Sequence, residues 1–176
     1  MDLKSMNMFL SEDNIKRHLE HLRTYRLRLS IVEKSFPDLK GRGIREILRM
    51  NIAKDVKDEI VRLSWQIKSH ECFFDSFTDQ PHVKSCKLKH YSSKEKFIYD
   101  LFLEAREREY GFLYVYKDKY DIPRYRFSDE NDGAFIHYQP KLALDLYEHT
   151  YFNDYGFKKE EFLRRALNYL NLERLN

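Results

Sequence analysis

Residues 140–155 read PKLALDLYEHTYFNDY, and this stretch decides how the second half of the chain folds. Leucine stands at every second position from 142 to 146, which is the two-residue period of a β-strand. Asp145 lies among these leucines, where a carboxylate costs free energy unless it is paired or bound to a metal. His149 follows where the strand should give way to a helix. The simpler alternative is an ordinary strand-to-helix junction with Asp145 as the N-cap.

Upstream, two long segments carry apolar residues at alternating spacings of three and four, which indicates one buried face on each of two helices. The first helix follows Ser11, a good N-cap, and ends near Pro37. Each buried face contains one histidine. We expect an antiparallel helical hairpin with a short connection. The two faces comprise Ile15, His18, Leu22, Tyr25, Leu29 and Val32, and then Val56, Ile60, Leu63, Ile67, His70, Phe74 and Phe77.

A single histidine on an apolar face is more often a hydrogen-bonded core residue than a ligand. Two histidines on facing helices change that expectation, because helical bundles build metal sites from facing side chains. Together with the carboxylate and the imidazole of residues 140–155, these two histidines make a donor set that suits iron, manganese or zinc and leaves one position on the metal for solvent. The candidate metal ligands are therefore His18, His70, Asp145 and His149. The histidines expected in surface loops are His82, His90 and His137.

The rest of the chain completes an α+β fold class. We predict an N-terminal antiparallel helical hairpin domain in residues 1–80 and a C-terminal α/β domain with a small three-stranded antiparallel sheet in residues 91–176. Residues 81–90 contain Pro81 and little periodicity, so they form a candidate linker. The expected strands are 112–116, 124–128 and 142–146, and the expected helices of this half start at Ser92 or Ser93 and at Lys158.

Composition narrows the class of protein without naming a partner. A chain of 176 residues with 42% hydrophobic and 35% charged residues is globular, and only 5 Gly exclude a Gly-rich phosphate loop. The net charge of +3 predicts neither a nucleic-acid nor a membrane partner, and we interpret the cluster of Lys40, Arg42, Arg45 and Arg49 as a solvated helix face. The start of the chain has no apolar signal segment and the 2 Cys suit free thiols, so we expect a cytoplasmic protein.

Three separated segments resemble the iron/manganese superoxide dismutase family. DLYEHTYFNDY at 145–155 is similar to the family signature D-x-W-E-H-A-Y-Y-x-D-Y. FLSEDNIKRH at 9–18 is similar to I-S-x-x-T-x-x-x-H, and QIKSHECFFDSF at 66–77 is similar to Q-V-W-N-H-T-F-Y-W-N-x-L. The resemblance implies the same four ligands, with one iron or manganese ion per subunit. It also implies conversion of superoxide, a small anion, to dioxygen and hydrogen peroxide, in a homodimer.

The resemblance also implies roles around the metal. Gln66 matches the glutamine with which iron-type members hydrogen-bond the metal-bound solvent and tune its potential. The family tyrosine should stand eight residues after the first ligand, where this chain has Arg26. One missing residue would explain this shift and would make Tyr25 the active-site tyrosine and His21 the gateway histidine. Three expected tryptophans are replaced by an aromatic wall of Phe112, Tyr114 and Tyr147.

Further positions concern the surface around the site. Glu148 matches the glutamate that bridges to the partner subunit's ligand histidine, and Phe152 replaces a second gateway tyrosine at the same interface. Lys159 falls where the family often has an arginine at the mouth of the substrate funnel, and Arg23 is a second candidate for steering the anion. The Gly-Gly segment that usually precedes the second ligand helix is missing.

Three other functions compete with dismutation. The first is a metal-binding homologue with little or no activity, which the altered gateway and aromatic wall favour. The second is a structural or interaction protein that keeps the fold without metal, which retention of all four ligands disfavours. The third is an all-helical di-metal carboxylate protein, which would need a glutamate three residues before His18 and His70. Isoleucine occupies both of those positions.

Overall fold

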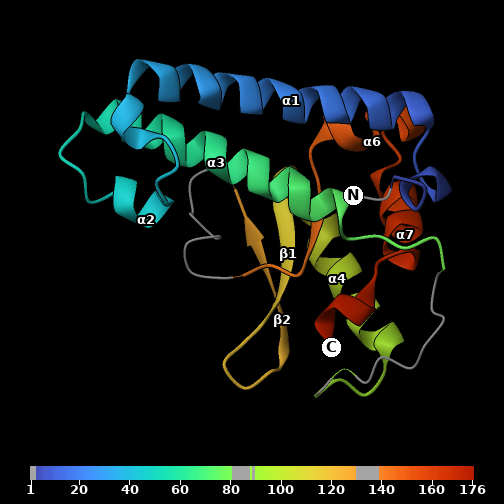
Figure 1. Ribbon diagram of the computed structural model, residues 1–176. Helices are drawn as coiled ribbons and strands as arrows, with labels where there is room; N and C mark the ends of the chain where they lie inside the picture. The colour runs from blue at the N-terminus through green and yellow to red at the C-terminus, as the bar shows by residue number, and fades with distance from the viewer. Residues whose placement is uncertain (1–2, 81–87, 89, 130–138) are drawn as a thin grey trace.

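The structure is a computed structural model that describes residues 3–80, 88, 90–129 and 139–176. It confirms an α+β architecture in which a helical hairpin lies against a small sheet and further helices (Figure 1). Most of the predicted linker lies outside the described residues, as do His82, Cys86, His137 and the loop at 131–133. The division of the chain at this linker stays a prediction.

The hairpin consists of α1 (Glu12–Ser35) and α3 (Lys54–Phe74), which lie side by side and run in opposite directions (Figure 1). Ser11 is the N-cap that the sequence predicts, because its side chain accepts a hydrogen bond from the Asn14 amide at 3.2 Å. Both predicted faces are largely buried, including His18 and His70. The three-four periodicity is therefore confirmed on both helices.

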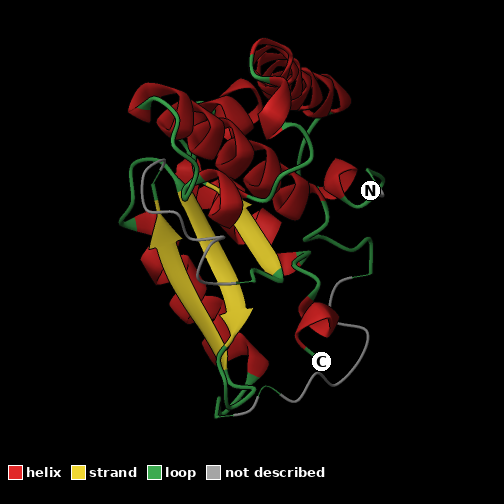
Figure 2. Ribbon diagram, turned by 60° about the vertical axis from the view of Figure 1, so that its left-hand side comes forward, coloured by secondary structure: helices red, strands yellow, loops and turns green. Residues whose placement is uncertain are grey.

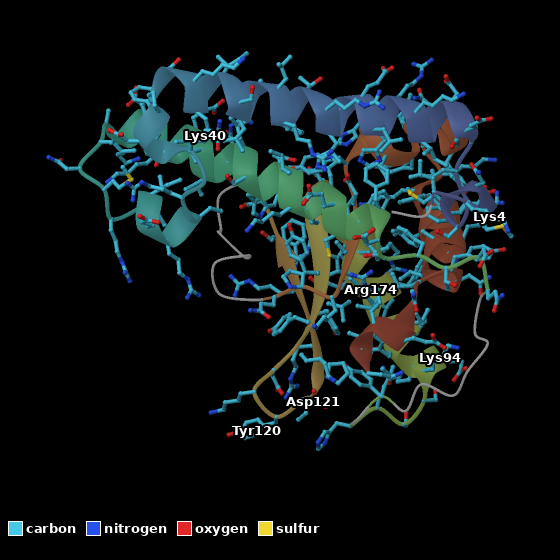
Figure 3. The ribbon with its side chains drawn as sticks, in the orientation of Figure 1. Lys4, Lys40, Lys94, Tyr120, Asp121 and Arg174 are labelled. Carbon is cyan, nitrogen blue, oxygen red and sulfur yellow. The ribbon has the colours of Figure 1, made fainter. Side chains whose placement is uncertain are left out.

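The expectation of a short connection between the two helices is wrong. Residues 36–53 contain a 3-10 turn at Pro37–Leu39 and the short helix α2 (Ile44–Ile47), and Lys40 lies at this end of the hairpin (Figure 3). The connection folds back because Leu39 and Ile47 are buried against Ile60 of α3. This small second core stabilises a segment that has no long periodic pattern of its own.

The sheet has the order β2-β1-β3 and is antiparallel throughout, as predicted (Figure 2). Its strands are β1 (Phe112–Lys117), β2 (Pro123–Ser128) and β3 (Leu142–Asp145). Every residue of β3 is buried, since α3 packs against this strand and β1 pairs with it. Phe112 is the register partner of Asp145, so an aromatic side chain starts β1 next to the carboxylate that ends β3.

Within the described residues, three further α-helices follow the hairpin. Ser93 caps α4 (Lys94–Arg106), which packs against β1, β2 and α7. The helix ends well before Gly111, whose φ of +105° and close approach to the Ser128 carbonyl leave no room for a Cβ. α6 (Glu148–Tyr155) begins directly after β3, and α7 (Lys159–Asn168) follows it.

One continuous hydrophobic core contains residues of both halves, from Met6 to Leu175. The hairpin and the sheet are thus packed on each other, and the ends of α1, α3, β3 and α6 that carry the candidate ligands meet inside this packing. Among the helices that the structure describes, none is long and apolar enough to cross a membrane.

Candidate metal centre

The four predicted ligands come together from four different elements. His18 comes from α1, His70 from α3, Asp145 from the last position of β3, and His149 from the first turn of α6. One nitrogen or oxygen of each lies within 4.8 Å of those of the others. Three of the side chains are fully buried, and His149 is 35% exposed. The cluster is therefore closed to solvent except on the side of α6.

Asp145 Oδ2 is the centre of this cluster. It lies 3.1 Å from His18 Nε2, 3.5 Å from His149 Nε2 and 3.7 Å from His70 Nε2. The other carboxylate oxygen, Oδ1, accepts a hydrogen bond from the Tyr147 amide at 3.0 Å, just before α6 begins. Asp145 therefore fixes the turn into α6 with one oxygen and presents the other to three imidazoles.

The ring of His70 is oriented by its own helix. Its Nδ1 lies 2.7 Å from the Gln66 carbonyl, and because a carbonyl can only accept, Nδ1 carries the proton. In the neutral ring Nε2 then has a free lone pair, and this atom faces Asp145 Oδ2. Histidines that bind a metal through one ring nitrogen usually donate the N–H of the other ring nitrogen to such a carbonyl.

The donor atoms fit a metal ion better than they fit one another. Within the described residues, His18 Nε2, His70 Nε2 and Asp145 Oδ2 are buried and make no hydrogen bond. His18 Nε2 lies 3.1 Å from Asp145 Oδ2, but the two atoms are not aligned for a hydrogen bond. Buried polar atoms without partners cost about 1–3 kcal/mol each. A cation among three imidazoles and a carboxylate would satisfy all of them, and the donor set suits iron, manganese or zinc.

The protonation states suit a metal as well. Burial lowers the pKa of His70 to about 3, and it lowers the pKa of His18 also. Burial by itself would raise the pKa of Asp145, but the neighbouring His149 and His18 hold that pKa well below its ordinary value. The imidazoles of His18 and His70 are thus neutral and the Asp145 carboxylate is ionised near neutral pH, which are the forms that bind metals.

Two further candidates from the sequence, Tyr25 and His21, lie beside the ligands. The Tyr25 ring is 5.6 Å from that of His70, and His21 lies 4.7 Å from Tyr25 and 4.6 Å from His149. Arg26 points elsewhere, since its guanidinium pairs with Glu71 at 2.7 Å on the hairpin surface. Tyr25, seven residues after His18, therefore lies at the cluster, and Arg26, eight residues after it, does not.

Aromatic side chains surround the ligands. Phe112 lies 5.4 Å from His70, and Tyr147 is stacked on His149 at 5.5 Å. Tyr114 contacts no ligand ring directly but is stacked on Phe112 at 5.9 Å. Phe73 and Phe74 each lie 5.1 Å from His18; the sequence predicts Phe74 only as a core residue and does not single out Phe73. Phe73 stands three residues after His70, a helical spacing that would have revealed it.

A hollow of about 390 Å³ leads from the surface to His18 and His149. Glu148, Phe152 and His21 line it, and the interface roles of Glu148 and Phe152 stay predictions. Arg17 also lines the hollow and was missed, although it stands one turn before His21 on the same helix. Asn153 completes the lining.

The two predicted steering residues lie elsewhere. Lys159 is half-buried, and its ammonium donates to the Arg108 carbonyl near the end of α4. Arg23 is exposed on α1. Neither lines the hollow, so a role of Lys159 or Arg23 in steering stays a prediction. Gln66 is buried one turn before His70, where the resemblance expects it.

The fold and the cluster define the class of protein as an α+β protein with a buried three-histidine, one-aspartate site suited to a single metal ion. The family described as "Iron/manganese superoxide dismutases, C-terminal domain" matches residues 82–176, just over half of the chain. The chain belongs to the iron/manganese superoxide dismutase family. Among curated proteins, no relative matches it. The match includes Asp145 and His149, whereas His18 and His70 are supported by their position beside them.

Proposed function

We propose that this protein is a superoxide dismutase with one iron or manganese ion per subunit, held by His18, His70, Asp145 and His149. One observation carries the proposal: among the described residues Asp145 Oδ2 makes no hydrogen bond, and it faces three imidazole nitrogens that lie 3.1 to 3.7 Å away. An iron or manganese ion there supplies the one-electron chemistry that converts two superoxide ions and two protons to dioxygen and hydrogen peroxide.

The surrounding residues prepare the site for a small anion that must receive protons. Gln66 and Tyr25 are the groups that we propose hold and pass protons, because an amide and a phenol can both donate and accept hydrogen bonds. The rings of Phe112 and Tyr147 exclude bulk water from one side of the ligands. Arg17 is a cationic side chain on the wall of the hollow, and its guanidinium pairs with Asp13 at 2.9 Å.

We further propose that the protein works as a homodimer. The hollow is open at His149 and is lined by Phe152, which is 42% exposed; Phe157, 92% exposed, packs on Phe152 at 5.3 Å. Glu148 is exposed beside them and can reach a partner subunit. Sedimentation of the wild type as a dimer and of Glu148→Ala as a weaker dimer is expected. A monomeric wild type at micromolar concentration contradicts this part of the proposal.

The test is metal content and superoxide dismutation, measured on the same protein purified from cells. We expect near-stoichiometric iron or manganese with high turnover, and loss of both in His70→Ala and Asp145→Ala. Asp58→Asn, at an exposed ion pair of α3, is the matched control and should retain both. Undiminished metal in either ligand variant refutes the site.

The second candidate function is a metal-binding homologue without dismutase activity. It is favoured by Phe152, which brings no hydroxyl to the rim of the hollow. Stoichiometric metal without turnover, after reconstitution with iron and with manganese, would select this alternative.

A further inference from the structure

Two buried hydroxyl groups meet beside the metal site without touching it. Ser69 of α3 and Tyr114 of β1 are 0% and 1% exposed, and their oxygens lie 2.5 Å apart. Ser69 directly precedes the ligand His70. The contact joins the ligand helix to the sheet at the level of the ligand.

The direction of the hydrogen bonds follows from the number of protons. Ser69 Oγ donates its only proton to the Trp65 carbonyl at 2.6 Å, so the Tyr114 hydroxyl is the donor toward Ser69. One residue further along the helix, His70 Nδ1 donates to the Gln66 carbonyl at 2.7 Å. The side chains of Ser69 and His70 thus donate hydrogen bonds to two successive backbone carbonyls of the preceding turn of α3. Tyr114, from β1, donates a hydrogen bond to Ser69.

Tyr114 also acts on His70 through its ring. It is stacked on Phe112 at 5.9 Å with an angle of 4° between the planes, and Phe112 meets the His70 ring at 5.4 Å with an angle of 71°. Trp65 supports Phe112 from another side at 5.4 Å. The His70 ring therefore lies between α3 and the Phe112 ring, and the Tyr114 ring packs on Phe112.

We propose that Ser69 and Tyr114 are positioning residues that fix the orientation of the His70 ring, so that Nε2 faces the metal position. This inference rests on the proposed function, because it assigns the two hydroxyls a role toward the same metal. Loss of a group hydrogen-bonded to a ligating histidine typically lowers metal affinity about 10- to 100-fold, and Ser69 and Tyr114 act one contact further from His70, so we expect a loss at the lower end of that range. A contact that only joins α3 to β1 would change stability without changing affinity.

The experiment uses Tyr114→Phe, which removes one oxygen and keeps the stacked ring. Tyr155→Phe is the matched control, because the Tyr155 hydroxyl is likewise buried and donates to the Phe9 carbonyl, while its ring packs on Phe162 rather than on a ligand. The readouts are the Mn²⁺ dissociation constant, measured by competition with a chelator, and the visible spectrum of the Co²⁺-loaded protein. We expect about tenfold weaker Mn²⁺ binding and an altered Co²⁺ spectrum for Tyr114→Phe only.

Ser69→Ala tests the same bond from its other end. Since Ser69 and Tyr114 act through one hydrogen bond, the double variant should lose no more affinity than either single variant. Wild-type affinity and spectrum in Tyr114→Phe, or equal effects of Tyr114→Phe and Tyr155→Phe, would overturn the inference and leave the contact a purely structural one.

Failure of the proposed function gives a different result. A wild-type protein that binds neither iron nor manganese refutes the proposed function. The positioning role is tested separately in the metal-free protein, by the ¹⁵N NMR signals of the His70 ring. Tyr114→Phe should shift the ring signals of His70 because the ring is held less firmly, and Tyr155→Phe should leave them unchanged. Unchanged His70 signals in Tyr114→Phe overturn the positioning role.

Discussion

Gln66 is a buried amide on the core-facing side of α3. It stands one turn before His70, and its own backbone carbonyl accepts the proton of the His70 ring. A buried polar side chain on a core-facing helix needs a reason, because burial without function would favour leucine. The proposed reason is that the amide dipole acts on solvent bound to the metal.

Gln66→Leu should therefore shift the reduction potential of the bound metal by at least about 60 mV, the one-electron equivalent of a tenfold change. The folded state should lose little stability, since leucine has a similar volume and the backbone carbonyl is retained. The measurement is redox titration of the metal-loaded protein. Gln80→Leu, at an exposed position, is the control and should leave the potential unchanged. An unshifted potential in Gln66→Leu would remove this residue from the site.

The helices that carry His18 and His149 are joined by side chains outside the cluster. Asp154 of α6 accepts hydrogen bonds from the Ser11 amide at 2.8 Å and from Asn14 Nδ2 at 3.0 Å, at the start of α1. Asn14 also donates to the Thr150 carbonyl at 3.0 Å. A carboxylate at the N-terminus of a long helix is favourable to the helix dipole as well. These contacts fix the distance between two of the ligand-bearing elements.

This contact predicts a pH-dependent effect of Asp154→Asn. Partial burial by itself would raise the pKa of Asp154, but hydrogen bonds from Ser11 and Asn14 lower it below the ordinary value. A carboxylate with a lowered pKa in the folded state stabilises the fold above its unfolded pKa, about 3.9. That stabilisation is lost as the pH falls through the folded pKa.

Because Asp154 is exposed and its charge is screened by solvent, Asp154→Asn should cost about 0.5–1 kcal/mol of unfolding free energy at pH 7 and progressively less below about pH 4. Urea denaturation of both proteins across this range measures the difference. Asp58→Asn serves as the control, because exposed ion pairs contribute little, about 0–1 kcal/mol. A difference that is constant from pH 7 to pH 3 would show that the charge of Asp154 plays no part.

The elements that the sequence predicts well are those with local signals. Ser11 and Ser93 cap helices where side-chain caps are expected, and the strands follow from β-branched and aromatic residues between turns. The connection at 36–53 was misread because α2 is too short to show a period, and Leu39 and Ile47 become core residues only through contact with α3. When a residue is buried by an element distant in the sequence, the residues around it show no periodic pattern that predicts its burial.

The site shows the same limit. The four ligands could be predicted because two histidines interrupt apolar faces and one aspartate interrupts a strand, and each is anomalous within its own segment. Lys159 could not be placed, because its half-burial beside Arg108 depends on how α4 meets α7. Arg17 looks like any exposed helical arginine until the hollow beside α6 is known.

At the scale of the whole molecule, an ion in this site would join α1, α3, β3 and α6. A ligand that binds only the folded state stabilises it, by about 2.7 kcal/mol when its free concentration is 100 times its dissociation constant. For a chain of this size that corresponds to a rise in Tm of about 5–10 °C.

Loading with Mn²⁺ at that concentration should therefore raise the Tm by about 5–10 °C, and a chelator should reverse the rise. Differential scanning calorimetry with and without metal measures it. His70→Ala should show no rise, because the remaining groups no longer enclose the ion. A metal-dependent rise of the same size in His70→Ala would mean that the ion binds somewhere else.

The order of the ligands along the chain has a consequence for biosynthesis. A ribosome releases positions 18 and 70 long before positions 145 and 149, and domains fold as their residues emerge. The helical hairpin alone offers two imidazoles and no carboxylate, which is half of the donor set. An ion can be captured firmly only after β3 and α6 have left the ribosome and docked. For the proposed metal site, the ion is then chosen from those that surround the chain once residue 149 has emerged, rather than from those present while the hairpin is being synthesised.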